Sequence, residues 1–432
     1  MLTAFIRAFR TPDLRKKLLF TLFIVAVFRL GSSLPTPGVS ERAVQACLST
    51  SASKANLLQL VNLFSGGALL KLSVFALGIM PYITASIILQ LLAVVIPRLE
   101  TLRQEGQSGQ AKITQYTRYL TIGLAILQST GIIALARSGN LITGCNNLIP
   151  NSSVFTISTM VICMTAGTAV IMWLGELITD RGVGNGMSLM IFTQVIAVIP
   201  GEFEQIYEDK HAFVFGLVVL VGVAIIAFVA LMEQAQRRIP VQYAKRMVGR
   251  RMYGGTSTYI PLKVNQAGVI PVIFASSLLY IPQLAAQLFS KNATSGWAQW
   301  VEANLARGDS AAYAGLFFVL IVFFTYFYVS ITFNPTEVAD NMKKYGGFIP
   351  GIRPGGPTAG YLSYVLSRLT AAGSLYLALV ALIPVVAIGL LSSDQQFPLG
   401  GTSIMIAVGV GLDTVKQIES QLQQRNYEGF LR

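Results

Sequence analysis

The chain has 432 residues, of which 53% are hydrophobic and 12% are charged, with a mean hydropathy of +0.61 and a formal net charge of +13. This composition excludes a soluble globular protein and indicates an integral membrane protein. Only helices and closed barrels satisfy every backbone group in hydrocarbon, and the apolar runs of this chain are long enough for helices.

The apolar runs predict an all-α fold with ten transmembrane helices. They lie near residues 17–35, 73–96, 115–137, 154–177, 186–200, 212–232, 266–289, 311–333, 370–391 and 400–418. The fifth run is the shortest. No small-residue cleavage site follows the first run, so we expect a retained span and not a signal peptide.

The second run belongs to a longer apolar stretch whose length does not fit one helix. Residues 63–97 read LFSGGALLKLSVFALGIMPYITASIILQLLAVVIP, which is too long for one span and too short for two with a turn. Transmembrane helices tolerate proline, so Pro81 is not expected to end a helix that runs from about Ser73 to Ile96. The remainder, 63–72, is too short to span.

Basic residues set the expected orientation. Most Lys and Arg residues fall in segments on the same side as the N-terminus, which predicts that both termini are cytoplasmic. This arrangement leaves two long cytoplasmic loops, near 234–265 and 334–369. The ten spans divide into halves of five, 1–200 and 201–432. An odd number per half gives the halves opposite orientations, as in an inverted repeat.

The spans lack the side chains that an intramembrane enzyme or an ion-coupled transporter needs. Their acids, Glu176, Glu233 and Asp413, lie towards cytoplasmic ends, and Arg29 lies towards an external end. These positions offer no paired acids at the membrane midplane. His211 is the single histidine, so it has no ligand set for a metal. A secondary transporter of a small solute remains the alternative function.

The cysteines give little further guidance. Cys163 lies within a span, where a small apolar packing role is expected. Cys47 and Cys145 fall in predicted external loops, where a disulfide is chemically allowed but not required by the sequence.

Both long cytoplasmic loops are basic and contain interleaved Tyr, Gly and Pro residues. Short loops with one or two lysines would be enough to fix the topology. We therefore favour a docking surface for an acidic partner or for RNA phosphates over a purely topological role.

Several bulky apolar residues are candidates for lining a central path. Ile79 and Ile83 are four residues apart, as are Met187 and Ile191, so each pair shares a helix face. Ile273 and Ile406 lie early in their spans. The sequence alone does not join these six residues into a ring.

Seven segments carry a resemblance to a known family. They are FSGGALLKLSVFALGIMPYITASIILQLL, EGQSGQAKITQYTRYLT, MWLGELITDRGVGNGMSL, QRRIPVQYAKRMVGRR, PLKVNQAGVIPVIFASS, FNPTEVADNMKKYGGFIPGIRPG and GGTSIMI. Together they extend over nearly the whole chain. The chain resembles the SecY/Sec61-alpha family, which includes the channel subunits of the bacterial Sec protein translocase.

The resemblance implies an hourglass pore in the bacterial cytoplasmic membrane. It carries secretory polypeptides across and releases transmembrane segments sideways into lipid. The family has no catalytic residue, metal or cofactor of its own. The implied partners are the SecE and SecG subunits, the motor ATPase SecA, the ribosome, signal sequences and the lipid bilayer.

The resemblance also implies roles for individual residues. The pore ring consists of Ile79, Ile83, Met187, Ile191, Ile273 and Ile406, where Met187 departs from the usual isoleucine and is expected to make the ring more yielding. The plug is a half-helix near 57–72 with Ser65, Gly66, Gly67 and Lys71. The lateral gate includes Gln90, Gln128, Ser276 and Ser277. Partner docking uses Lys245, Arg246, Arg250, Arg251 and Arg353, although Arg353 has the alternative of bracing its own loop.

Overall fold

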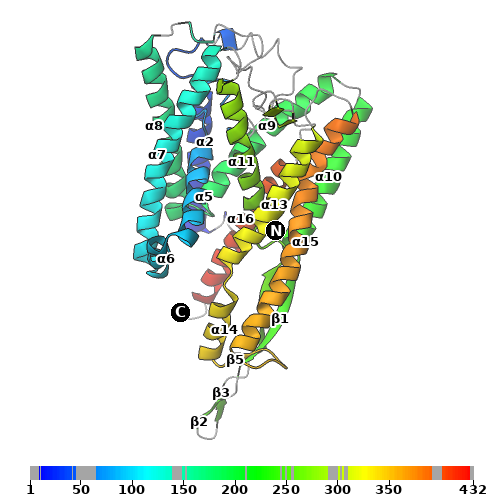
Figure 1. Ribbon diagram of the computed structural model, residues 1–432. Coiled ribbons are helices and arrows are strands. Elements are labelled where there is room, and N and C mark those ends of the chain that lie inside the picture. The colour runs from blue at the N-terminus through cyan, green and yellow to red at the C-terminus, as the bar shows by residue number, and fades with distance from the viewer. Residues whose placement is uncertain are drawn as a thin grey trace.

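The protein is described by a computed structural model (Figure 1). The described residues are 9, 11–40, 42–44, 65–138, 148–150, 153–209, 212–243, 246–248, 251–253, 257–289, 300–301, 304–305, 310–391 and 401–428. Every predicted span overlaps a helix in this part of the chain. The long helices are α2 (Pro12–Ser33), α5 (Met80–Val95), α7 (Gln107–Ser138), α8 (Val154–Arg181), α9 (Gly186–Asp209), α10 (Ala212–Gln234), α11 (Ile270–Phe289), α13 (Ala311–Thr332), α15 (Gly356–Leu391) and α16 (Gly401–Glu428).

The helices form two groups that follow the order of the chain. In the first group α7 packs against α5 and α8, and α8 also contacts α2 and α9. In the second group α13 packs against α11 and α15, and α16 contacts α10 and α15. The two groups meet where α9 contacts α16 and where α11 contacts α5 and α7 (Figure 1).

Among the described residues, four helices are long and apolar enough to cross a membrane, namely α7, α8, α13 and α15. Taken together, α5 and α6 (Pro97–Gln104) would also be long and apolar enough to cross a membrane, but the two helices are bent by 105° relative to each other. Parts of α9, α10 and α11 are shorter apolar helices. The number of ten crossings therefore stays a prediction.

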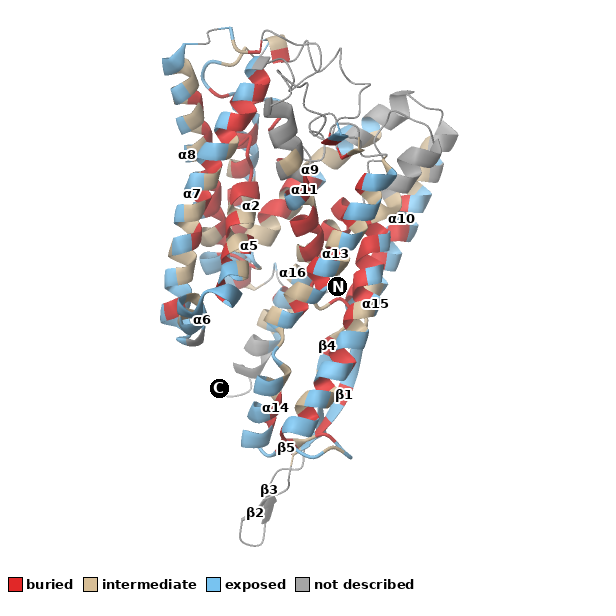
Figure 2. Ribbon diagram, in the orientation of Figure 1, coloured by how far each residue is buried: buried red, intermediate tan, exposed pale blue. Residues whose placement is uncertain are grey.

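The outer faces of the helices carry large apolar side chains. Phe155 is 82% exposed, Leu231 72% and Phe23 65%. Figure 2 shows buried residues gathered where α2, α5 and α11 come together. Extensive exposure of such side chains is destabilising in water, so this surface suits a hydrocarbon environment.

The prediction for the second span is wrong at its start. Residues 65–79 form turns, interrupted at Ser73 by an isolated antiparallel bridge to Pro35, and α5 begins only at Met80, with Pro81 in its first turn. Gly78 has φ +55° and Leu72 has φ +47°, which a right-handed helix does not allow. Proline is favoured in a first helical turn because its missing N–H has no helical partner there.

The expectation of an all-α fold also needs correction, because the two long basic loops contain strands. β1 (Gln236–Tyr243) pairs antiparallel with β4 (Ser257–Lys263) and with β5 (Gly347–Phe348), in the order β4-β1-β5. A second hairpin joins β2 (Arg246–Val248) to β3 (Arg251–Tyr253). Alternating burial along β1, with Ile239 and Val241 inside, explains why this basic segment is extended.

The strands and the short helix α14 (Pro335–Lys344) build one folded lobe, which we define as the described residues of 236–263 and residues 335–366. Its core contains Ile239, Val241, Leu262, Met342, Ile349, Leu362 and Val365. The two loops thus pair with each other, and α10 and α15 lead from the helical bundle directly into the lobe (Figure 1).

Candidate functional site

The six predicted ring residues come together in one apolar cluster. Ile79, Ile191, Ile273 and Ile406 are buried members, with exposed fractions of 1%, 8%, 6% and 2%. Ile83 and Met187 are half-buried and pack against the same cluster. These residues arrive from α5 and its N-cap, from α9, from α11 and from α16. The cluster therefore lies where the two helix groups meet.

Local contacts fix where α9 begins and therefore where the Met187 side chain lies. The Asn185 side chain accepts hydrogen bonds from the backbone N–H groups of Met187 (3.0 Å) and Ser188 (3.4 Å), as expected at a helix N-terminus. A Cβ on Gly175 of α8 would lie 2.6 Å from Met187 Sδ. A Cβ on Gly186 would lie within van der Waals overlap of the Gly175 carbonyl oxygen. The two glycines let α9 begin directly against α8.

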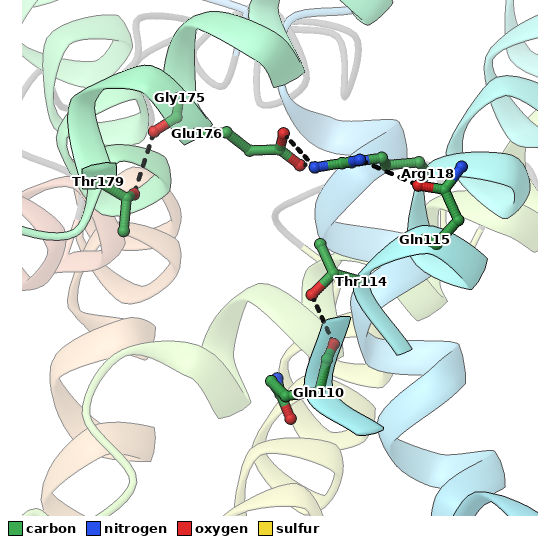
Figure 3. A network of polar contacts seen from close by, with 7 residues as sticks. All are labelled: Gln110, Thr114, Gln115, Arg118, Gly175, Glu176 and Thr179. Carbon is green, nitrogen blue, oxygen red and sulfur yellow. Dashed lines mark hydrogen bonds and ion pairs between the residues drawn. The ribbon is translucent and has the colours of Figure 1, made fainter. Parts of the chain in front are cut away.

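A charge pair joins α7 to α8 beside this contact (Figure 3). Arg118 donates to both carboxylate oxygens of Glu176, at 2.9 and 2.7 Å, and to Gln115 Oε1 at 2.9 Å. Such bidentate pairs fix the relative orientation of two side chains. Glu176 follows Gly175, whose carbonyl oxygen accepts from Thr179 Oγ1. The pair therefore holds the part of α8 on which Met187 packs.

The segment before α5 is firmly packed even though it is not helical. Val74 N donates to the Leu34 carbonyl at 2.9 Å, and Thr36 donates through N and Oγ1 to the Leu72 carbonyl at 3.1 and 2.7 Å. Leu69 and Leu72 are fully buried. Phe75 stacks on Phe28 of α2, with ring centroids 5.8 Å apart.

The predicted plug residues lie in the first turns of this segment. Ser65 is buried, Gly66 and Gly67 are half-buried, and Lys71 is exposed. Gly66 and Gly67 have φ of +68° and +84°, so residues 65–72 do not form the expected half-helix. Residues 57–64 lie outside the described part of the chain.

The four predicted gate residues are not joined to one another by hydrogen bonds among the described residues. Gln90 is exposed and bonds to Ser86 of its own helix, while Gln128 is half-buried. Ser276 Oγ donates back to the Ile273 carbonyl, and Ser277 Oγ is buried with no hydrogen-bond partner among the described residues. Their helices nevertheless face each other, because α11 contacts both α5 and α7.

One hydrogen bond crosses between the helix groups near this seam. Arg103 of α6 donates through Nη2 to the carbonyl oxygen of Ile331, at 3.1 Å. Ile331 is in the last turn of α13, where carbonyl oxygens have no partner within the helix. A cation at a helix C-terminus is also favoured by the helix dipole.

Three of the predicted docking residues, Arg246, Arg251 and Arg353, belong to the described part of the lobe. Arg353 is exposed, and its guanidinium makes no hydrogen bond with the described residues. This arrangement does not support the alternative in which Arg353 braces its own loop. Arg246 and Arg251 are on the β2–β3 hairpin. Lys245 and Arg250 lie outside the described residues.

Other sequence predictions concern residues that are mostly not described. Cys47, Cys145 and His211 lie outside the described ranges, and Cys163 is a free, half-buried thiol on α8. Within those ranges, no group of three His, Cys, Asp or Glu side chains is placed to hold a metal ion.

Sequence reasoning assigned no contact to four residues that make or shape contacts at this site. Arg118 and Glu176 were detectable in principle, since opposite charges inside two apolar runs suggest a pair. Arg103 and Gln194 carried no such signal. Arg103 donates to a backbone carbonyl 228 positions away in the sequence. Gln194 matters only because Gly66, from a distant part of the chain, packs next to it.

The sequence matches a known family along most of its length. A family model described as SecY matches residues 73–415. The protein translocase subunit SecY of Streptomyces scabiei is 65% identical over 439 residues, which cover 100% of both chains. The protein translocase subunit SecY of Mycobacterium tuberculosis (strain ATCC 25618 / H37Rv) is 60% identical over 441 residues, again covering 100% of both.

Solved structures share the fold at lower sequence identity. A protein conducting channel matches with a TM-score of 0.65 at 18% identity, over 94% of this chain and 91% of that chain. A SecY channel whose plug domain stabilises the closed state matches with a TM-score of 0.62 at 17% identity, over 94% and 91%. Sec61 in the canine ribosome-channel complex matches with a TM-score of 0.63 at 16% identity, over 94% and 91%.

Proposed function

This chain belongs to the SecY family, and we propose that it is a channel for unfolded secretory polypeptides in the bacterial cytoplasmic membrane. The family is one of protein-conducting channels and not of enzymes. The observation that carries the proposal is the apolar cluster to which six side chains from four parts of the chain contribute.

The six residues are proposed to form the waist of an hourglass pore. A narrow apolar constriction excludes water and ions because they leave it by dewetting. Flexible apolar side chains can close around a polypeptide of any sequence, so such a pore needs no charged binding site. Met187 is expected to adapt most easily because its thioether chain is unbranched.

Crosslinking tests the waist directly. In a chain whose native cysteines are replaced by serine, Ile83→Cys is expected to crosslink to a secretory precursor stalled during transport. Ile162→Cys is the matched control, since Ile162 is 67% exposed on α8 and lies outside the cluster. Equal crosslinking at the two positions, or crosslinking only at position 162, would refute the pore. Transport of a small solute without crosslinking would favour the alternative, a secondary transporter.

Residues 65–72 are proposed to belong to a plug that closes the external side of the waist. The support is that Gly66 packs against α9, the helix that carries Met187 and Ile191. Removal of this segment would open an aqueous path beside the waist.

The seam between α5 and α7 on one side and α11 and α13 on the other is proposed as the lateral gate. An apolar signal helix would leave the pore here and enter lipid. Gln90, Gln128, Ser276 and Ser277 are proposed to line the seam. Individual polar contacts inside membranes contribute only about 1 kcal/mol, so an apolar helix can displace them. The bond from Arg103 to Ile331 spans the same two halves.

The lobe is proposed to dock the ribosome and SecA. Lys245, Arg246, Arg250, Arg251 and Arg353 would supply the contacts, because arginine pairs bidentately with carboxylate and phosphate groups. SecE and SecG are proposed as the membrane partners. Ten spans in two inverted halves, with both termini in the cytoplasm, would place the lobe on the cytoplasmic side.

A further inference from the structure

Arg29 is a charged residue within the predicted first span, and it has a definite partner. Its Nη1 donates to the carbonyl oxygen of Gly66, at 3.3 Å. A guanidinium at membrane depth is unfavourable unless it is paired or faces water. The acceptor here is the backbone of the proposed plug, 37 positions along the chain.

A second helix holds the same residue from another side. A Cβ on Gly66 would lie 3.2 Å from Cα and 3.4 Å from the carbonyl oxygen of Gln194, on α9. Gly66 also has φ +68°, which disfavours any other residue. The backbone at position 66 is therefore held between α2 and α9.

Gln194, whose Cα, Cβ and carbonyl oxygen lie next to Gly66, carries a side-chain amide that is unpaired among the described residues. Gln194 is 0% exposed, and neither its Oε1 nor its Nε2 has a hydrogen-bond partner in the described chain. It follows Ile191 by three residues, which places it about 4.5 Å further along the helix axis. A buried amide without partners destabilises the state that buries it. Departure of the segment would let water reach this amide.

We propose that Arg29 and Gln194 act in opposite directions on the seating of residues 65–72. Arg29 stabilises the seated segment through its charged hydrogen bond, and Gln194 destabilises it through its unpaired amide. The two are positioning residues that set how often the segment is released. This inference rests on the proposed plug function of the segment.

The proposal predicts effects of opposite sign. Arg29→Met keeps the length of the side chain but removes the donor of an exposed hydrogen bond, so release of the segment should become about two- to fivefold more frequent. Gln194→Leu keeps a similar volume but removes the amide, so release should become about tenfold less frequent. The double variant should lie between the two single variants.

Thiol labelling measures release without relying on transport. Leu69 is fully buried, so the thiol of Leu69→Cys should be protected from labelling while residues 65–72 keep this packing. The full chain, with its native cysteines replaced by serine and with its co-purified membrane partners, is reconstituted in liposomes. The rate of modification by a charged maleimide is then compared among variants. Arg137→Met is the control, because Arg137 is exposed at the end of α7 and has no partner among the described residues.

The expected order of labelling is Arg29→Met fastest, then the unaltered and Arg137→Met chains together, then Gln194→Leu. The same rate in Arg29→Met and Arg137→Met, or faster labelling in Gln194→Leu, would overturn the proposal. Transport of a secretory precursor is measured in the same liposomes. If the labelling order is as expected but transport is the same in all variants, the plug function of residues 65–72 is refuted. The proposed roles of Arg29 and Gln194 in holding this segment are then still supported.

Discussion

Gly167 offers a sharp test of how the segment before α5 is held. A Cβ at position 167 of α8 would lie within van der Waals overlap of the Val74 carbonyl oxygen, and 3.1 Å from Phe75 Cδ1. Neither backbone can move easily, because α8 is a continuous helix and Val74 is hydrogen-bonded to Leu34. Gly167→Ala must therefore push the segment away from α8.

The size of the effect follows from this overlap. Overpacking of a well-packed interior costs about 1–3 kcal/mol, and two backbones in contact favour the upper end. Gly123→Ala on α7 is the matched control, since nothing lies within 4 Å of its Cβ position. In a helix interior this change should stabilise by about 0.5–1 kcal/mol. The same substitution should thus differ by roughly 3–4 kcal/mol between the two sites.

Thermal unfolding of the purified chain in detergent measures this difference. Gly167→Ala should lower the apparent Tm by several degrees, while Gly123→Ala should leave it unchanged or raise it. Unfolding of membrane proteins is often irreversible, so both variants are compared at one scan rate. Equal Tm values, or a Gly167→Ala chain as stable as the unaltered one, would show that the close approach of α8 to Val74 is wrong.

The seam and the lobe give two further predictions. Arg103→Met should speed insertion of a fluorescent signal peptide in proteoliposomes about two- to fivefold, because an exposed charged contact contributes at most about 1 kcal/mol. Arg98→Met, an exposed neighbour whose guanidinium makes no hydrogen bond to the described residues, is the control and should match the unaltered chain. Arg353→Glu should abolish SecA-driven transport with an unchanged Tm, because Arg353 is exposed and its guanidinium makes no hydrogen bond with the described residues. Normal SecA-driven transport by this variant would contradict its docking role.

The sequence determined the class of protein and the approximate position of each helix. Long apolar runs satisfy their backbone groups only as helices in hydrocarbon, so periodicity and length were enough. The lobe strands were missed because the basic residues of 234–265 hid a period-two pattern. Ile239 and Val241 alternate with exposed residues there, which is a strand signal on a half-buried surface.

The start of α5 could have been predicted better from local chemistry. Gly78 and Pro81 together favour a helix that begins between them, as it does at Met80. The prediction relied on the tolerance of transmembrane helices for proline. That tolerance holds where neighbours replace the lost hydrogen bond, and a helix start needs no replacement.

The sequence by itself determined that this is a helical membrane protein, offered candidates for lining a central path and marked its basic loops. These features are local, because hydrophobicity and charge depend only on the residues within each segment. The tertiary structure decided which residues meet. Distant segments are connected by the cluster that joins Ile79 to Ile406, by the hydrogen bond from Arg103 to Ile331 and by the hydrogen bond from Arg29 to Gly66. Two of these contacts use backbone carbonyls as acceptors, and every residue has one, so no sequence pattern marks them.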